Sequence, residues 1–334
     1  MKAIVYSGYG SADILRLEEI PEPQVGEDDL LVRVRAASVN PYDWHLLTGL
    51  PYIGRMHFGW FGPKGNGGLG ADLAGEVEAV GAHVKRFRPG DAVFGMVDGG
   101  TPGKPLLDLG SFAEYVRVSE DSVAPKPANV TFEQAAAVPA AAFTALAALR
   151  DQGRLEPGQA ALINGASGGV GTFAVQIAKA LGADVTGVCS TRNVDMVRSL
   201  GADHVVDYTR EDFTTGGERY DLILDNVGNR SLSEYRRVLT RQGVYFASFG
   251  RPENRWLGPF PYLLRMAAAS RFGSQRLVSL TPSRAPEALT ALKELIEAGA
   301  VTPVIDRTYA LAEVPEAIRY LEEGHARAKV IITA

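Results

Sequence analysis

A glycine-rich turn between an apolar strand and a helix constrains the fold of this 334-residue chain more than any other feature. The run "AALIN" at 160–164 is short and apolar, as expected of a buried strand. After the glycines, apolar residues recur at steps of three and four, which predicts a helix with one buried face: Val170, Phe173, Ala174, Ile177, Ala178 and Leu181. A strand, a glycine turn and a helix in this order indicate a parallel α/β unit whose turn can hold a phosphate.

The turn departs from the dinucleotide-binding pattern G-x-G-x-x-G at one position. Residues 166–171 read A-S-G-G-V-G, so alanine stands at the first glycine position. Gly168 still lets the backbone approach a phosphate, and Gly171 still lets the helix pack closely on the strand. We therefore predict that the free amides at the helix start hold the pyrophosphate of a dinucleotide, with contacts from Ser167, Gly168, Gly169, Val170 and Gly171. The alternative is a turn with a purely structural role.

The segment "CSTRN" at 189–193 bears on the choice between NAD and NADP. An NAD-selective site would carry Asp or Glu about 20 residues after the glycines to bind the ribose 2′-hydroxyl. Here Arg192 offers a cationic partner, and Ser190 and Thr191 offer hydroxyls, which suits a 2′-phosphate. We predict NADPH as the cofactor. The alternative is that Arg192 only opens the next helix into solvent.

The pattern of strands and helices changes twice along the chain. Residues 1 to about 125 alternate in the manner of strands separated by Gly- and Pro-rich turns, which predicts an antiparallel, barrel-like β domain. From about Thr131, short apolar runs alternate with helical segments, which predicts parallel strands joined by crossover helices. After about residue 275 the β-domain pattern returns. We therefore predict an α/β fold class with two domains, one formed by residues 1–128 and 273–334 and the other by residues 129–272.

Composition and charge exclude several classes of protein. The net charge of −5 leaves no overall positive field for a polyanion, so we expect no nucleic-acid partner. The single cysteine, Cys189, excludes an intramolecular disulfide and any zinc site with two thiolates. No export signal is visible, and the apolar segment 256–272 is interrupted by prolines and an arginine. We expect a cytoplasmic protein with no membrane partner.

Six motifs together are similar to one family along nearly the whole chain. They are "ASVNPYDW" (37–44), "GADLAGEVEAVG" (70–81), "FRPGDAVFG" (87–95), "GSFAEYV" (110–116), "NGASGGVG" (164–171) and "GADHVVDY" (201–208). On these motifs the chain resembles the zinc-independent branch of the medium-chain dehydrogenase/reductase superfamily, close to quinone oxidoreductases and enone reductases. The resemblance implies a GroES-like β-barrel domain, a Rossmann domain with a doubly wound parallel sheet, NADPH as cofactor and, commonly, a homodimer.

The resemblance also implies chemistry without a metal ion. Zinc-containing relatives carry a cysteine at the position of Asn40 and a histidine at that of Ala71, next to Asp72. Neither side chain here is a plausible zinc ligand, and residues 80–115 hold no counterpart of the cysteine-rich structural zinc loop. Without zinc to polarise a simple carbonyl, a quinone or an α,β-unsaturated carbonyl is the more natural hydride acceptor. Two alternatives stay open: a metal-independent alcohol or aldehyde oxidoreductase, and a non-catalytic NADPH-binding partner protein.

Three residues near one loop are the predicted catalytic residues, mostly because of the resemblance. The Asn40 amide would donate to the substrate oxygen or hold the nicotinamide ribose hydroxyl, although "NPYD" also suits a plain turn. Asp43 would orient the same loop, or only cap a local turn. Tyr52 would supply a proton or line the pocket, although most tyrosines only pack.

Further cofactor contacts are expected at strand ends and near the carboxyl terminus. Thr144 in "FTAL" is similar to a family position near the nicotinamide or phosphate, and Tyr208 to one over the adenosine phosphate. A helix-surface threonine and a strand-end aromatic residue are the alternatives. An open α/β sheet binds its ligand at the carboxyl ends of its strands. The remaining candidates are Asn226, Ser248, Phe249 and Gly250 at such ends, and Arg327 and Lys329 in a basic segment before the last strand.

Overall fold

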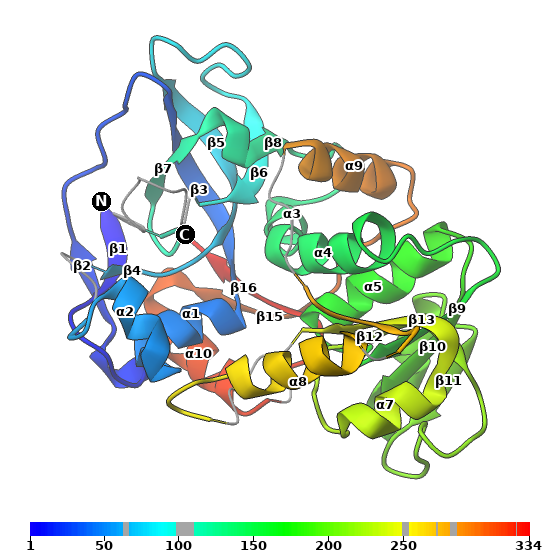
Figure 1. Cartoon of the computed structure of the whole chain (residues 1–334). Coiled ribbons are helices and arrows are strands. Elements are labelled where there is room, and N and C mark those ends of the chain that lie inside the picture. Colours follow the sequence, from blue (N-terminus) through cyan, green and yellow to red (C-terminus); the bar gives the residue numbers. More distant parts are fainter. Residues whose placement is uncertain (63–66, 98–109, 249–253, 272, 281–285, 325) are drawn as a thin grey trace. The chain divides into compact units, whose positions relative to one another are not determined.

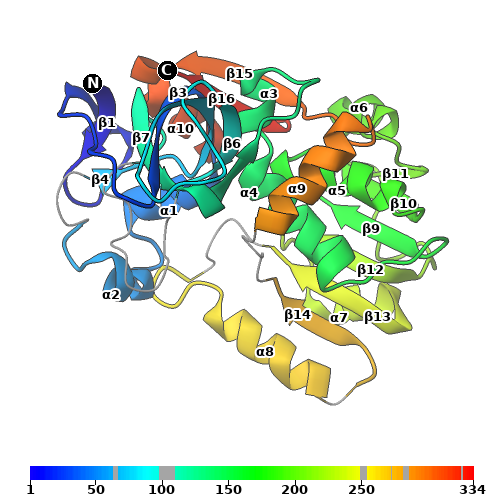
Figure 2. The same cartoon turned by 90° about the horizontal axis from the view of Figure 1, so that it is seen from above.

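The chain divides into two compact units (Figures 1 and 2). The computed structural model describes residues 1–62, 67–97, 110–248, 254–271, 273–280, 286–324 and 326–334. Unit 1 comprises Met1–Ala140, Arg284–Glu297 and Pro303–Ala334, and unit 2 comprises Ala141–Ser283 and Ala298–Thr302. The sequence pattern places the boundaries earlier, after residues 128 and 272. The first boundary lies later in the structure because helix α3 (Phe132–Ala136) packs on strands of unit 1.

Unit 2 contains a six-stranded parallel sheet with the strand order β11-β10-β9-β12-β13-β14. Numbered along the unit, this is the order 3-2-1-4-5-6 of a doubly wound, dinucleotide-binding sheet. The winding reverses between β9 and β12, and such sheets bind their ligand beside this switch point. The strands are β9 Ala160–Asn164, β10 Asp184–Cys189, β11 His204–Asp207, β12 Tyr220–Asp225, β13 Leu239–Ala247 and β14 Arg276–Ser279.

Helices cover both faces of this sheet, with α5 on one face and α7 and α8 on the other (Figure 1). The sequence predicts that one apolar face of helix α5 is buried. In the structure most of its residues are buried, and these include the polar residues Thr172 and Gln176. The Gln176 amide is satisfied by backbone groups of Thr172 and Thr302. The helical elements are α4 Pro139–Leu146, which begins in unit 1, the π-helix η4 Ala147–Asp151, α5 Gly169–Ala180, η5 Thr191–Asn193, α6 Val194–Ser199, α7 Leu232–Val238 and α8 Phe260–Arg271.

Unit 1 contains a seven-stranded sheet with the order β15-β16-β3-β5-β6-β8, in which β7 also pairs with β3, and a three-stranded sheet β2-β1-β4. Its strand pairs are antiparallel except β15 with β16. The strand pairs within residues 1–125, where the sequence predicts antiparallel strands, are all antiparallel. The parallel pair lies in the carboxyl-terminal segment, where helix α10 (Val314–Glu322) returns the chain to the same edge of the sheet. The strands are β1 Lys2–Tyr6, β2 Arg16–Glu19, β3 Asp29–Val39, β4 Gly67–Gly68, β5 Asp72–Val80, β6 Ala92–Met96, β7 Tyr115–Ser119, β8 Val123–Pro125, β15 Ile305–Ala310 and β16 Lys329–Thr333.

The helices of unit 1 have between three and twelve residues. Thr131 caps α3, and its partner in the capping box is Gln134, three residues later. The other helices of unit 1 are η1 Ala12–Ile14, α1 Pro41–Thr48, η2 Tyr52–Gly54, α2 Arg55–Phe58, η3 Glu120–Ser122, α9 Pro286–Glu297, η6 Leu311–Glu313 and α10 Val314–Glu322.

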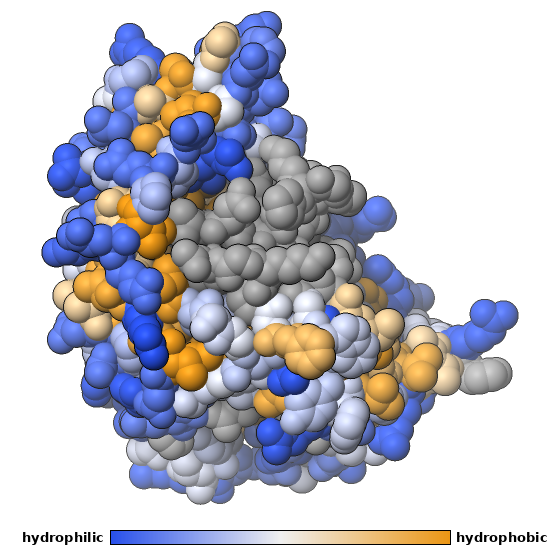
Figure 3. Space-filling view, turned by 90° about the vertical axis from the view of Figure 1, so that its left-hand side faces the viewer, coloured by the Kyte–Doolittle hydropathy of each residue, from blue (hydrophilic) through white to orange (hydrophobic). Residues whose placement is uncertain are grey.

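Each unit has its own apolar core. Leu47, Leu73 and Ile318 are fully buried in unit 1, and Leu162 and Ile223 in unit 2. No helix within the described ranges is long and apolar enough to cross a membrane. On the face shown in Figure 3, apolar residues form separate groups among hydrophilic ones.

Candidate active site and cofactor-binding residues

The loop after β9 leaves the first turn of α5 open to a ligand. Gly165 has a φ of +79°, a left-handed conformation that glycine adopts without strain. Gly168 is the N-cap of α5, and no side chain caps the helix there. A Cβ built on Gly168 would meet only the carbonyl oxygen of Gly165, at 3.4 Å. The amides of this turn therefore face space that an anionic group can enter.

Gly171 has the opposite surroundings. A Cβ on Gly171 would lie 2.1 Å from the Gly165 carbonyl oxygen and 2.7 Å from Ala166, so only glycine fits. Helix α5 therefore packs directly against the loop that precedes it. An open backbone at Gly168 and a close contact at Gly171 are what a dinucleotide pyrophosphate requires, so this loop fits the predicted cofactor.

Asn193 ties the glycine loop to the segment after β10. Its Nδ2 donates to Ser167 Oγ at 3.0 Å and to Ser190 Oγ at 3.3 Å. The residue is only 4 % exposed, and its Oδ1 has no hydrogen-bond partner in the part of the chain that the structure describes. A buried oxygen of this kind, next to two predicted cofactor residues, suits a donor from the ligand.

The Thr191 hydroxyl is engaged within the protein. It donates to Asp207 Oδ2 at 2.5 Å and lies 2.9 Å from Thr209 Oγ1. The hydrogen bond from Thr191, more than those from Thr209, holds the pKa of Asp207 below its usual range. Arg192 and Tyr208 are exposed. Because Arg192 lies in η5, directly before α6, its position agrees with either of its two predicted roles.

A pocket of about 240 Å³ lies at the carboxyl ends of β13 and β14. The predicted residues Thr144 and Ser248 both line it, as do Ala247, Pro259, Leu263, Ser279 and Leu280. Phe249 and Gly250 lie outside the described residues. The pocket is where a parallel sheet binds its ligand, so it agrees with the predicted role of this edge.

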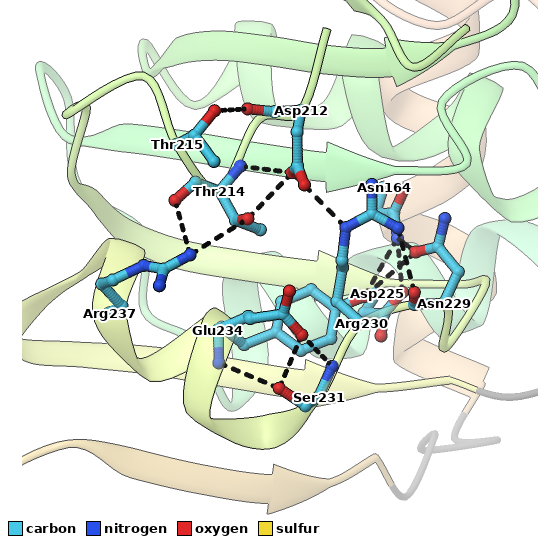
Figure 4. Close-up of polar contacts among 11 residues, drawn as sticks. Asn164, Asp212, Thr214, Thr215, Asp225, Asn229, Arg230, Ser231, Glu234 and Arg237 are labelled. Carbon is cyan, nitrogen blue, oxygen red and sulfur yellow. Dashed lines mark hydrogen bonds and ion pairs between the residues drawn. The ribbon is translucent and has the colours of Figure 1, made fainter.

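A buried polar network fixes the loop after β12 (Figure 4). Asn164 Nδ2 donates to Asp225 Oδ1 at 2.8 Å, to Asn229 Oδ1 at 3.0 Å and to the Tyr235 hydroxyl at 3.1 Å. The predicted residue Asn226 donates from Nδ2 to the Asn164 carbonyl oxygen at 3.1 Å. Its Oδ1 has no partner among the described residues, so Asn226 offers a spare acceptor beside the switch point of the sheet.

Asn40 lies in a buried polar cluster of unit 1. Its Nδ2 donates to Asp72 Oδ2 at 3.0 Å and to the Ser38 carbonyl oxygen at 3.2 Å, and its Oδ1 accepts from Lys329 Nζ at 2.7 Å. Ser38 Oγ donates to Asp72 Oδ2 at 2.6 Å. Both amide hydrogens of Asn40 are thus engaged. Donation to a substrate oxygen requires one of these bonds to open, whereas Oδ1 can accept a further hydrogen bond as it stands.

The two predicted basic residues near the carboxyl terminus differ in their surroundings. Lys329 is only 3 % exposed, and its Nζ lies 3.4 Å from Oδ2 of the fully buried Asp72. Arg327 is exposed, and its backbone N–H donates to Asp306 Oδ2 at 2.8 Å. Lys329 therefore belongs to the Asn40 cluster and not to a solvated basic surface.

Asp43 is fully buried and holds the loop that begins at Asn40. Its Oδ2 accepts from the Asn40 backbone N–H at 2.7 Å, and its Oδ1 accepts from the Gly70 N–H at 2.8 Å. Burial raises the pKa of Asp43 to about 7, against the lowering effect of these two hydrogen bonds. These contacts agree with the orienting role that the resemblance implies.

Tyr52 belongs to a cluster around Arg55. The guanidinium carbon of Arg55 lies 4.7 Å from the centre of the Tyr52 ring and 4.2 Å from that of Tyr9. Arg55 also donates to the carbonyl oxygens of Gly49 and Thr48, at 3.0 and 3.2 Å, and so caps the end of α1. The cation–π contact therefore holds the Tyr52 ring near the carboxyl-terminal end of α1, whereas Asn40 is the N-cap at the amino-terminal end of that helix.

Comparison with known proteins agrees with this fold. Residues 26–128 match the alcohol dehydrogenase GroES-like domain, and residues 200–332 match a family described as zinc-binding dehydrogenase. The mitochondrial NAD(P)H oxidoreductase RTN4IP1 of Mus musculus is 35% identical over 360 residues, which cover 99% of this chain and 89% of that protein. The chain belongs to the medium-chain dehydrogenase/reductase superfamily.

Two further comparisons place the chain in the quinone oxidoreductase-like branch of this superfamily. The chloroplastic NADPH-dependent alkenal/one oxidoreductase of Arabidopsis thaliana is 32% identical over 349 residues, covering 99% of this chain and 79% of that protein. The structure of the quinone oxidoreductase from Coxiella burnetii superposes with a TM-score of 0.85 at 30% identity, covering 100% of this chain and 99% of that one. The predicted superfamily, its quinone oxidoreductase-like branch, the GroES-like domain and the Rossmann sheet are confirmed.

The structure brings some of the predicted residues together within each unit, and their roles stay predictions. Unit 2 brings the glycine loop to Ser190, and unit 1 brings Lys329 to Asn40. Sequence reasoning missed the contacts of Asn193, Asp207 and Ser38, although they stand in the quoted segments 189–193, 201–208 and 37–44, because these segments do not indicate their tertiary partners. Asp72 stands in one of the motifs that carry the resemblance, directly after Ala71, where zinc-containing relatives carry a histidine. This position was the available signal that Asp72 belongs to the site.

Proposed function

We propose that this protein is an NADPH-dependent reductase of quinones or α,β-unsaturated carbonyls that works without zinc. The observation that carries the proposal is the buried cluster of Asn40, Asp72 and Lys329. Asn40 offers an amide where zinc-containing relatives carry a thiolate. The Lys329 ammonium, 3.4 Å from Asp72 Oδ2, would repel a divalent cation bound beside that carboxylate. The cluster therefore favours an acceptor that does not need a metal ion for activation.

The names of the relatives support the same substrate class. The Arabidopsis thaliana relative is named for NADPH and for alkenals and alkenones, and the Coxiella burnetii structure for quinones. Both acceptor types are conjugated. Negative charge that develops on their oxygen is delocalised, and a few hydrogen bonds can hold it.

The residues of this chain would bind the cofactor at both of its phosphate groups. The amides of Gly169, Val170 and Gly171 would hold the pyrophosphate, and Ser190 and Arg192 would hold the 2′-phosphate. When bound, NADPH supplies a hydride. Asn40 Oδ1 would accept from a ribose hydroxyl, and one proton from water or Tyr52 would balance the charge on the reduced acceptor.

The experiment that tests this proposal is NADPH oxidation, followed by absorbance, by the purified protein after treatment with a chelator. A matched panel contains a quinone, an enone and the corresponding saturated aldehyde, each with NADPH and with NADH. We expect turnover of the quinone or the enone with NADPH, and none or much less with the saturated aldehyde. Faster reduction of the saturated aldehyde supports a metal-independent aldehyde oxidoreductase instead. NADPH binding without any turnover supports a non-catalytic partner protein.

We also propose that the protein is a homodimer, because the family that it resembles commonly forms one. We propose a cytoplasmic location, because no export signal is visible in the sequence. Sedimentation at micromolar concentration tests the dimer, and fractionation of the source cells tests the location. A monomer across the concentration range, or recovery in another compartment, contradicts the respective proposal.

A further inference from the structure

Unit 1 buries two carboxyl groups and one ammonium close to one another. Asp43 and Asp72 have no exposed surface, and Lys329 on β16 is almost fully buried. Removing such groups from water is costly unless they are paired and hydrogen-bonded. Lys329 meets this condition through Asn40 Oδ1 at 2.7 Å and Asp72 Oδ2 at 3.4 Å. The buried ammonium of Lys329 is therefore stabilised by Asn40 and Asp72.

These partners fix the orientation of the Asn40 side chain. An ammonium has only hydrogens to offer, so it must face the amide oxygen and not the amide nitrogen. The nitrogen then faces Asp72 Oδ2 and the Ser38 carbonyl oxygen, which are both acceptors. If the amide were flipped, two donors would oppose each other at Lys329 and two acceptors at Asp72. Lys329 and Asp72 thus select one of the two amide orientations.

Asp72 also contacts the amino-terminal end of helix α4. Its Oδ1 accepts from the backbone N–H of Ala140 at 2.9 Å, in the first turn of α4. A carboxylate is favoured at the amino-terminal end of a helix. The Lys329 ammonium lies 3.4 Å from the other carboxylate oxygen of Asp72, Oδ2. The same ammonium thus supports the Asn40 amide directly and the start of α4 through Asp72.

We propose that Lys329 is a positioning residue for cofactor binding, which holds Asn40 with its Oδ1 available as an acceptor for a ribose hydroxyl of NADPH. This inference rests on the proposed function for the identity of the ligand. Lys329 is too deeply buried to touch substrate, so it acts through Asn40. The competing account is that Lys329 contributes only to stability.

A double-mutant cycle separates these two accounts. The proteins are the wild type, Lys329→Met, Asn40→Ala and the double variant, with NADPH affinity measured by fluorescence titration and stability by thermal unfolding. We expect each single variant to bind NADPH about tenfold more weakly, the scale of one lost hydrogen bond. The double variant should bind no more weakly than Asn40→Ala alone, because both changes remove the same contact.

Two outcomes overturn the proposal: NADPH affinity of Lys329→Met equal to that of the wild type, or losses in the two single variants that add in the double variant. Lys329→Gln keeps a donor for Asn40 Oδ1 and should bind NADPH with intermediate affinity, and it replaces Lys329→Met if that variant does not fold. Lys293→Met is the matched control, because Lys293 pairs with Glu297 on α9 at the surface. Binding is measured without an acceptor, so failure of the proposed reduction appears separately, as a wild type that binds NADPH but turns over no substrate.

Discussion

Gly168 and Gly171 belong to one loop, yet a side chain at each position would meet different atoms. At Gly168 the φ is −84° and a Cβ would enter nearly open space, whereas at Gly171 it would collide with the Gly165 carbonyl oxygen. The first glycine leaves room for a ligand, and the second allows α5 to pack on its own loop. Replacing them by alanine therefore separates cofactor binding from folding.

We expect the Gly168→Ala variant to keep its fold and to bind NADPH more weakly. Its cost in stability should be below about 1 kcal/mol, the scale of an altered helix cap, while NADPH affinity falls by about tenfold or more because the methyl group occupies the approach of the phosphate. Gly171→Ala should instead lower the free energy of unfolding by about 1–3 kcal/mol through overpacking. Urea unfolding and fluorescence titration measure the two effects. Full NADPH affinity in Gly168→Ala would contradict the proposed phosphate site.

Asp43 predicts a pH dependence of stability. Because burial raises the pKa of Asp43 to about 7, the folded protein keeps a proton on this group that the unfolded chain releases near pH 4. The stabilising contribution of Asp43 is therefore present at low pH and is lost as pH rises from about 4 to about 7, by up to about 1.4 kcal/mol per pH unit. The free energy of unfolding of the wild type minus that of Asp43→Asn should fall between pH 5 and pH 7. A difference that stays constant over this range would show that Asp43 does not titrate there.

Residues with a local signal could be predicted from the sequence, and residues with only tertiary contacts could not. The glycine pattern and its place between a strand and a helix identified Gly168 and Gly171. Asn193 and Asp207 gain their roles from Ser167 and Thr191, which are distant in sequence. Lys329 was predicted as a cofactor residue, but its burial against Asn40 depends on how β16 pairs with β3.

At the scale of elements, the mainly apolar strands of the parallel sheet were predictable and strand β15 was not. Strands β9, β10 and β12 lie inside the parallel sheet and are mainly apolar, so their sequences read as strands. Strand β15 lies at the edge of its sheet and is partly or fully exposed along its length, so it gives no apolar pattern. The alanine-rich segment after Thr131 forms separate helices α3 and α4, because Pro139 cannot continue the hydrogen bonding of α3.

The segment that follows β10 predicts selectivity between the two nicotinamide cofactors. Arg192→Ala should weaken NADPH binding by about tenfold and NADH binding by less than about twofold, because only NADPH carries the 2′-phosphate that the guanidinium would bind. Arg198→Ala, at an exposed position of α6, is the control and should change neither affinity. Titration of both cofactors against both variants measures the effect. Equal losses for NADPH and NADH in Arg192→Ala would refute the role of Arg192.

At the scale of the whole molecule, the two-unit organisation followed from the change in sequence pattern. A β-domain pattern at both ends of the chain, with an α/β pattern between them, predicts that the two ends form one unit and the middle another, as the structure shows. The boundaries were less predictable, since α3 reads as helical in sequence but packs on the strands of unit 1. The reaction depends on what each unit binds, and only an experiment on the intact protein reports on both.

The most direct test of metal-free conjugate reduction uses NADPH that carries deuterium at C4, with an enone as acceptor and a chelator present. We predict that the reduced product carries one deuterium at the carbon β to the carbonyl group, with the carbonyl intact and the rate unchanged by the chelator. Deuterium at the carbonyl carbon, loss of turnover with the chelator, or no transfer from NADPH would contradict the account.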